Sequence, residues 1–202
     1  MIREKPATGR RELVALRWGL VPTWTKEAGP GVGLVNARAE SLAGKPSFRD
    51  AFRARRCLIP ASGFYEWKAV GRARQPWLFQ LRDEPPFFLA GLWESWVGPD
   101  GAPLETCAVI TTAPNQLMHP IHHRMPAMVP FDAAEHWLDP TSHSESLAAS
   151  LRQPFSSDQM TARRVSSRIN SVANDDAACL SAADTDADNE DGQMAWDLCD
   201  DR

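Results

Sequence analysis

The sequence lacks several features that mark the commoner specialised classes of protein. No apolar run approaches 18 residues, so no membrane-spanning helix is expected, and the residues after Met1 lack the apolar stretch of a secretory signal. The four cysteines form no CxxC pair and have no histidine at zinc-finger spacing. We therefore expect a cytoplasmic protein with reduced thiols, no membrane partner, no metal and no cofactor.

Common catalytic motifs are also missing from the sequence. It contains no nucleophile elbow, no HExxH zinc site and no phosphate-binding loop, and the run GPGVG at 29–33 suits a flexible turn because no helix opens after it. Cys57 and Cys107 lie among apolar neighbours in expected strands. Both are interpreted as buried, unreactive thiols.

The charges that are present are strongly segregated along the chain. Residues 175–202 contain ten acidic residues and a single basic one, Arg202, which leaves 21 Lys and Arg against 16 Asp and Glu in residues 1–174. Residues 36–74 hold nine basic and three acidic side chains. Such an excess favours a polyanion such as nucleic acid, although a solvated face with ordinary ion pairs would look the same.

The hydrophobic pattern predicts an α+β domain around a mostly antiparallel sheet, curled or closed into a barrel, with a few short helices. One domain is expected over residues 1–173, followed by an acidic disordered tail over 174–202. Strands are predicted at 12–21, 34–40, 75–83, 86–97 and 104–112 and at RMPAMVP, and residues 56–70 are predicted to form two strands around a bend at Pro60 to Gly63. Helices are predicted at 41–55, 113–123 and 132–139, with Asp132 capping the last helix, and an extended segment at 161–172.

The first of three candidate constellations is the run NARAE. Asn36, Arg38 and Glu40 alternate along a predicted strand, so their side chains point to one face and could form the floor of a site. An exposed strand face with an Arg–Glu pair is the other interpretation.

The second candidate is Glu66, which stands among aromatic residues in GFYEWK. Such surroundings tend to raise the pKa of a carboxyl group, as a general acid requires. A carboxylate that points to solvent from a half-buried strand fits the pattern equally well.

The third candidate is His122 in PIHHRMP, where His119, His122, His123 and Arg124 fall within six residues. Imidazole suits proton transfer near neutral pH. A structural histidine is the alternative for any one of them, and the sequence offers no carboxylate or cysteine at the spacing of a metal site.

Seven segments stand together in the order and spacing of one family: RWGLVPTW, NARAES, KPSFR, RRCLIPASGFYEWK, AGLWE, TTAPN and PIHHRMPAMVP. From about Arg11 to Asn174 the sequence resembles the SRAP family, the SOS-response-associated peptidases or abasic-site processing proteins. The resemblance implies the SRAP fold and a role in the DNA damage response. It implies abasic sites in single-stranded DNA as the substrate, bound by a monomer that is associated with the nucleoid when on DNA.

In that family the nucleophile is a cysteine directly after the initiator Met. Its thiol and α-amine trap the sugar aldehyde as a thiazolidine, which is a covalent protein–DNA link, and a proposed autocatalytic removal of Met gives the family its peptidase name. The resemblance thus implies a cross-linking or lyase enzyme with a proposed hydrolase activity.

The resemblance also assigns roles to individual residues. Asn36 matches the asparagine that holds the amine and the sugar, Glu66 the acid–base glutamate, and His122 the histidine that assists ring opening and reversal. Five residues match DNA contacts: Trp24 beside the bases, and Arg38, Arg124, Thr111 and, less directly, Lys45 at phosphates. His123 stands where the family commonly has an acidic residue.

Residue 2 is Ile2, which has no thiol. We therefore expect the nucleophile of the working protein to precede Met1, and the opening ten residues to be the end of a strand and a turn inside a domain. Three alternatives stay open: a non-covalent single-stranded DNA-binding module, a thiol autopeptidase, and an inactive incomplete gene product.

Overall fold

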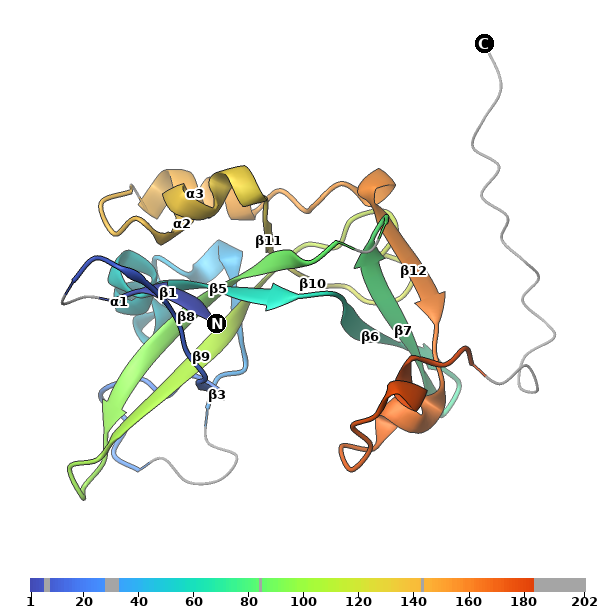
Figure 1. The fold of residues 1–202 in the computed structure, drawn as a ribbon, viewed down its shortest axis with the longest axis horizontal. Helices are drawn as coiled ribbons and strands as arrows, with labels where there is room; N and C mark the ends of the chain where they lie inside the picture. Colours follow the sequence, from blue (N-terminus) through green and yellow to red (C-terminus); the bar gives the residue numbers. More distant parts are fainter. Residues whose placement is uncertain (6–7, 28–32, 84, 143, 184–202) are drawn as a thin grey trace, which may run out of the picture.

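A computed structural model describes residues 1–5, 8–27, 33–83, 85–142 and 144–183 of the chain. The described chain forms two sheets and three short α-helices (Figure 1). The helices gather on the half that contains the larger sheet, while the three strands of the smaller sheet form the other half (Figure 1). This arrangement confirms the predicted α+β class with a mostly antiparallel sheet.

The larger sheet has the strand order β10-β9-β8-β5-β1-β2, with β11 added to β8 and the two parallel strands β3 and β4 added to β9. It is curled but not closed, because within the described residues its end strands β10 and β2 do not pair. Its strands are β1 (Ile2–Glu4), β2 (Arg11–Leu13), β3 (Arg17–Trp18), β4 (Asn36–Arg38), β5 (Arg56–Ala61), β8 (Phe87–Val97), β9 (Pro103–Thr112), β10 (Met125–Pro126) and β11 (Met128–Val129).

The smaller sheet has the order β12-β7-β6, antiparallel throughout. Its strands are β6 (Phe64–Val70), β7 (Ala73–Leu81) and β12 (Met160–Arg164). Strand β6 follows β5 after a short bend, as the sequence predicted, so the chain passes directly from the larger sheet into the smaller one (Figure 1).

The α-helices are α1 (Pro46–Ala54), α2 (Ala134–Leu138) and α3 (Ser144–Leu151), and the 3-10 turns are η1 (Ala39–Ser41), η2 (Phe131–Ala133), η3 (Ser157–Gln159), η4 (Ser167–Asn170) and η5 (Ala177–Leu180). Proline at the start of α1 suits a position whose N–H has no partner within the helix. The helix buries Phe48 and Phe52 against the larger sheet, which the four-residue spacing predicted. None of the described helices is long and apolar enough to cross a membrane.

Several predicted elements were wrong in extent or kind. The strand expected at 12–21 is broken into β2 and β3, and the one at 34–40 ends at Arg38, where η1 begins. Residues 116–121 form turns instead of a helix, since Pro120 has no N–H with which to continue the helical hydrogen bonds. Asp132 is not the N-cap residue that was predicted, because it lies inside η2, whose N-cap position is occupied by Pro130. Of the segment expected to be extended, residues 167–170 form η4.

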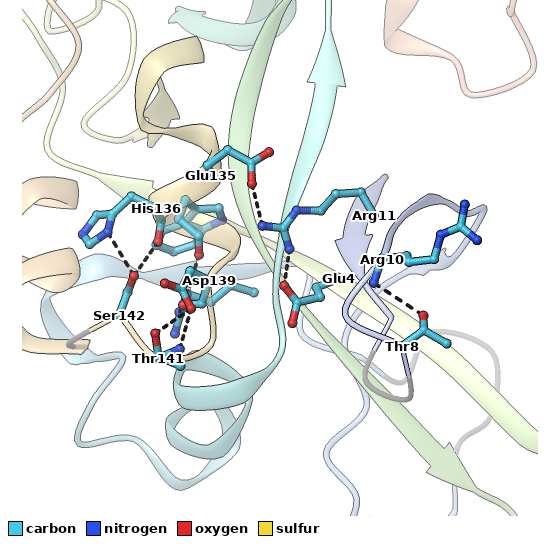
Figure 2. A network of polar contacts seen from close by, with 11 residues as sticks. Glu4, Thr8, Arg10, Arg11, Glu135, His136, Asp139, Thr141 and Ser142 are labelled. Atoms are coloured by element: carbon cyan, nitrogen blue, oxygen red, sulfur yellow. Dashed lines mark hydrogen bonds and ion pairs between the residues drawn. The ribbon is translucent and has the colours of Figure 1, made fainter.

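Among the described residues of the first ten, Ile2–Glu4 form a strand and Thr8 lies in a turn, as predicted. Strand β1 lies between β5 and β2, and each pairing is antiparallel. Arg11 on β2 forms ion pairs with Glu4 on β1 and, at 2.7 Å, with Glu135 on α2 (Figure 2). One guanidinium therefore joins the β1–β2 hairpin to the helical layer.

The first part of the segment expected to be a tail has an ordered place on the smaller sheet. Val165 and Ala182 form an antiparallel bridge, the Cys179 side chain is buried, and Arg168 pairs with Asp176 at 2.7 Å. Residues 184–202, which carry most of the acidic residues of the expected tail, lie outside the described residues.

Candidate functional site

Strand β4 places two polar side chains on one exposed face, as the alternation predicted. Asn36 and Arg38 are exposed, while Ala37 between them is fully buried. The strand runs parallel to β9, with Arg38 opposite Thr111. The position of β4 is therefore set by its main-chain pairing with β9.

A close approach of two glycines determines where β4 begins. A Cβ atom at Gly33 would lie 2.5 Å from the carbonyl oxygen of Gly19, and Gly33 has φ +150°. Leu20 and Leu34 form a bridge immediately beyond this contact. Only glycine allows the two chain segments to come this close.

An open groove of about 1130 Å³ lies beside β4. Its basic lining residues are Arg38, Lys45 and Arg124, and among the described residues Glu40 is the one acidic side chain in it. The groove is lined by Asn36, Arg38, Glu40, Ser41, Gly44, Lys45, Pro46, Phe48, His123 and Arg124. Its excess of positive charge suits an anionic ligand.

Arg124 is the most highly connected side chain in the groove. Its Nη1 donates to Glu40 Oε1 at 2.7 Å, and its Nη2 donates to Glu40 Oε2 at 2.9 Å and to the main-chain oxygen of Thr111 at 2.5 Å. The Thr111 hydroxyl lies 3.4 Å from Nη2. The hydrogen bonds that Glu40 accepts from Arg124 hold the pKa of Glu40 below its usual value, so the carboxylate is ionised.

Glu66 and His122 come together from separate parts of the chain. The Oε2 atom of Glu66 on β6 lies 3.4 Å from Nδ1 of His122, and the two side chains are 23% and 32% exposed. Burial raises the pKa of Glu66, while the charge of His122 and the main-chain N–H of Trp67 oppose the rise. The prediction of a raised Glu66 pKa is confirmed in direction, through burial.

The surroundings of His122 favour one tautomer. Nδ1 lies 2.9 Å from the main-chain oxygen of Arg124 and also faces Glu66, while the Arg124 N–H is farther away, at 3.3 Å. Two oxygen acceptors favour a proton on Nδ1. In the neutral ring the lone pair then lies on Nε2, which is the nitrogen available as a base.

The structure thus brings most of the predicted site residues into two adjoining groups. Asn36, Arg38, Lys45 and Arg124 line the groove, with Thr111 behind Arg124. The Glu66–His122 pair adjoins them through the bond to the Arg124 main chain. Trp24 is not among the described residues that line the groove, and this residue is 66% exposed on the loop after Val21.

Sequence reasoning missed two features of this region. Trp18, 61% exposed on β3, donates its indole N–H to the main-chain oxygen of Val35, next to Asn36. The other is the partnership of Glu40 with Arg124, since the sequence pattern suggested Arg38 as the partner of Glu40. No local signal could have identified it, because the two residues lie on different elements.

The prediction that Cys57 and Cys107 are buried is confirmed, with exposures of 0% and 7%. Burial also raises the pKa of both thiols. The described residues contain no group of three or more His, Cys, Asp or Glu side chains that could hold one metal ion.

A curled α+β fold with a basic groove beside a half-buried carboxyl–imidazole pair defines a class of protein whose site is suited to an anionic ligand and to proton transfer. The particular family is given by comparison with known proteins. The chain belongs to the SRAP family, described as SOS response associated peptidase, whose profile matches residues 1–172.

Relatives of the chain occur in bacteria and vertebrates. Abasic site processing protein YoqW of Bacillus subtilis is 45% identical over 160 residues, covering 79% of this chain and 71% of YoqW. Abasic site processing protein HMCES of Gallus gallus is 32% identical over 203 residues, covering 89% of this chain and 60% of that protein.

Solved structures share the fold. A protein from Bacteroides thetaiotaomicron superimposes with a TM-score of 0.75 at 33% identity, over 83% of this chain and 75% of that one. A protein from Bordetella bronchiseptica gives a TM-score of 0.71 at 26% identity, over 82% of each chain.

Proposed function

We propose that this chain binds single-stranded DNA at an abasic site and takes part in processing the lesion. Its relatives YoqW and HMCES are named abasic site processing proteins. The observation that carries the proposal is the Glu66–His122 contact of 3.4 Å beside a basic groove. A proton-transfer pair next to a phosphate-binding surface is what the opening of a sugar ring on DNA requires.

The groove residues divide the binding task between them. Arg38, Lys45 and Arg124 contact phosphates, with Thr111 supporting Arg124 from behind. Asn36 offers an amide that can donate and accept hydrogen bonds at the sugar. Trp24 provides an exposed indole on which a neighbouring base stacks.

Glu66 and His122 move protons at the lesion. The raised pKa of Glu66 keeps part of this group protonated closer to neutral pH than an exposed carboxyl, so it can act as a general acid. His122 Nε2 accepts a proton while Nδ1 stays bonded to Arg124. The thiazolidine that the family resemblance implies forms only on a cysteine with a free α-amine. Glu66, His122 and the groove residues therefore account for DNA binding and proton transfer, and the covalent step needs that cysteine in addition.

Fluorescence anisotropy with two labelled oligonucleotides tests the proposal. One carries a single abasic site made by uracil excision, and the other carries the intact base. We expect tighter binding to the abasic strand, with an affinity that falls as salt is raised. Arg38→Ala and Lys45→Ala should weaken binding to both strands and each reduce the slope of log affinity against log salt by about 0.7. Equal, salt-independent binding to both strands would contradict the proposal.

Non-covalent binding alone is the second candidate function. It is favoured by the burial of Cys57, Cys107 and Cys179, since no described cysteine presents its thiol to the groove. A denaturing gel separates the two candidates. A shifted, denaturation-resistant band with abasic DNA indicates a covalent link, whereas loss of all bound DNA in the gel indicates a binding module.

The monomeric state and the cytoplasmic location stay predictions.

A further inference from the structure

We propose that Glu40 occupies the phosphate-binding face of Arg124 in the free protein and that a DNA phosphate displaces it. This inference rests on the proposed function, because it assigns a competitor to one of the proposed phosphate contacts. Glu40 is then a residue that sets the affinity and selectivity of the groove.

The hydrogen bonds of Arg124 leave little of its guanidinium free for a ligand. A guanidinium has five N–H donors. Two of them point to the two oxygens of Glu40 and one to the main-chain oxygen of Thr111. The Nε–H is buried and has no partner among the described residues. A phosphate therefore cannot form two parallel bonds with Arg124 while Glu40 remains in place.

The carboxylate is the partner that is able to move. The Glu40 side chain is 46% exposed and stands on the short turn η1, whereas the Arg124 side chain is only 17% exposed. Arg124 is also held at its main chain by His122 and by the next residue, Met125, which begins β10. Rotation of Glu40 into water leaves the guanidinium fixed, with its paired donors facing the groove.

The geometry of this pair resembles that of a phosphate contact. A carboxylate bound through both oxygens places two acceptors where two phosphate oxygens would lie. Displacement of Glu40 also removes the one acidic side chain among the described lining residues from a groove that holds Arg38, Lys45 and His123. A free anion must compete with Glu40 at its own concentration, whereas a strand phosphate held by neighbouring contacts competes at a high effective concentration. The pair therefore favours polymeric phosphate over free anions.

The test compares Glu40→Gln with the wild type in anisotropy titrations with the abasic oligonucleotide. We expect the variant to bind about three- to fivefold more tightly at low salt, in line with the loss of one exposed competing ion pair. Asp50→Asn is the matched control, because Asp50 pairs with Arg49 on the exposed face of α1 and its loss changes the net charge equally. The control should leave the affinity within about twofold of the wild type.

A double variant shows whether the effect acts through Arg124. In an Arg124→Ala background, Glu40→Gln should no longer tighten binding, since the competed donor is gone. Unchanged or weaker binding by the single Glu40→Gln variant, with its circular dichroism spectrum preserved, would overturn the inference. Tightening of the same size by Asp50→Asn would also overturn it, because net charge alone would then explain the result.

A second readout does not depend on abasic DNA. Inorganic phosphate is titrated into wild type and Glu40→Gln while the arginine side-chain NMR signals are followed. The Arg124 signal, assigned by its absence in Arg124→Ala, should shift at several-fold lower phosphate concentration in Glu40→Gln. Equal midpoints would overturn the inference. Failure of the wild type to prefer abasic DNA, with different phosphate midpoints, would instead overturn the proposed function alone.

Discussion

Glu66 and His122 lie on opposite sides of the junction between the two sheets, with Oε2 and Nδ1 3.4 Å apart. Glu66 stands on β6 of the smaller sheet, while His122 stands in the turns that lead from β9 to β10 of the larger one. The contact links the half-buried carboxyl group to His122, which is bonded to the Arg124 main chain at the groove. The acid–base pair therefore exists only when both sheets are correctly docked.

Replacing Glu66 by Gln should change how stability depends on pH. Burial raises the Glu66 pKa, so the folded state favours the protonated carboxyl group. The stability of the wild type that comes from this preference is fully present below the ordinary pKa of about 4.3 and is lost as pH rises through the raised value. Thermal melts between pH 4 and 8 should show Glu66→Gln gaining on the wild type as pH increases.

The control for this experiment is Glu27→Gln, since the Glu27 side chain is exposed. Its melting temperature should follow that of the wild type at every pH. If Glu66→Gln and the wild type gave parallel curves over the whole range, the carboxyl group would not have the raised pKa described above.

Arg56 is a buried residue whose loss should reduce stability strongly. Its side chain donates to the main-chain oxygens of Phe52 and Arg53 at the end of α1 and of Trp137 and Asp139 around the end of α2. Arg56→Met leaves these carbonyls without a donor, so we expect a loss of about 3 kcal/mol in the free energy of unfolding. Urea denaturation measures it, with Arg56→Lys losing less.

Arg53→Met is the matched control for the Arg56 variant, because Arg53 lies three residues earlier, on α1, and its side chain is exposed. Its loss should stay within about 0.5 kcal/mol, as is usual for surface substitutions. Equal losses for Arg53→Met and Arg56→Met would show that the carbonyl bonds are not what stabilises the junction of α1 and α2.

Gly33→Ala should disturb the start of β4. A Cβ atom there meets the Gly19 carbonyl at 2.5 Å, and φ +150° is strained for any other residue. We expect a loss of about 1–3 kcal/mol together with weaker DNA binding, because Asn36 and Arg38 follow directly. Gly44→Ala has nothing within 4 Å of its added Cβ and should melt like the wild type. An unshifted melt of Gly33→Ala would contradict the close approach.

Trp24→Ala should weaken DNA binding without changing the melting temperature. Trp24 is 66% exposed, so removal of its indole leaves the core intact. Loss of one stacking platform should reduce affinity for single-stranded DNA by about 5- to 100-fold, and Trp24→Phe should restore part of it. Leu13→Ala, 75% exposed on β2, is the control and should bind normally. A Trp24→Ala variant that binds as the wild type does would remove Trp24 from the site.

Prediction from the sequence worked best where a short repeating pattern decides the local structure. The alternation in NARAE placed Asn36 and Arg38 on one face, and the Phe48–Phe52 spacing identified the buried side of α1. It worked less well where several local signals conflict. The apolar pattern at 113–123 suggested a helix although prolines divide it, and α3, which is short and rich in serine and alanine, was not predicted at all.

Arg56 shows a further limit of pattern reading. A basic residue in a charged run is normally assigned to the surface, yet its side chain is almost completely buried. The carbonyl groups that compensate for its burial come from two helices that are distant in sequence. No short stretch of sequence around Arg56 contains both of these helices.

The sequence by itself determined the family, the fold class and the identity of most candidate site residues, because ordered motifs and local periodicity are carried by neighbouring positions. The tertiary structure alone decided that Glu66 meets His122 and that Glu40, rather than solvent, faces Arg124. These pairings depend on how β4 and β10 pair with β9 and on where β6 of the smaller sheet lies relative to them, and that placement results from the burial of the core as a whole.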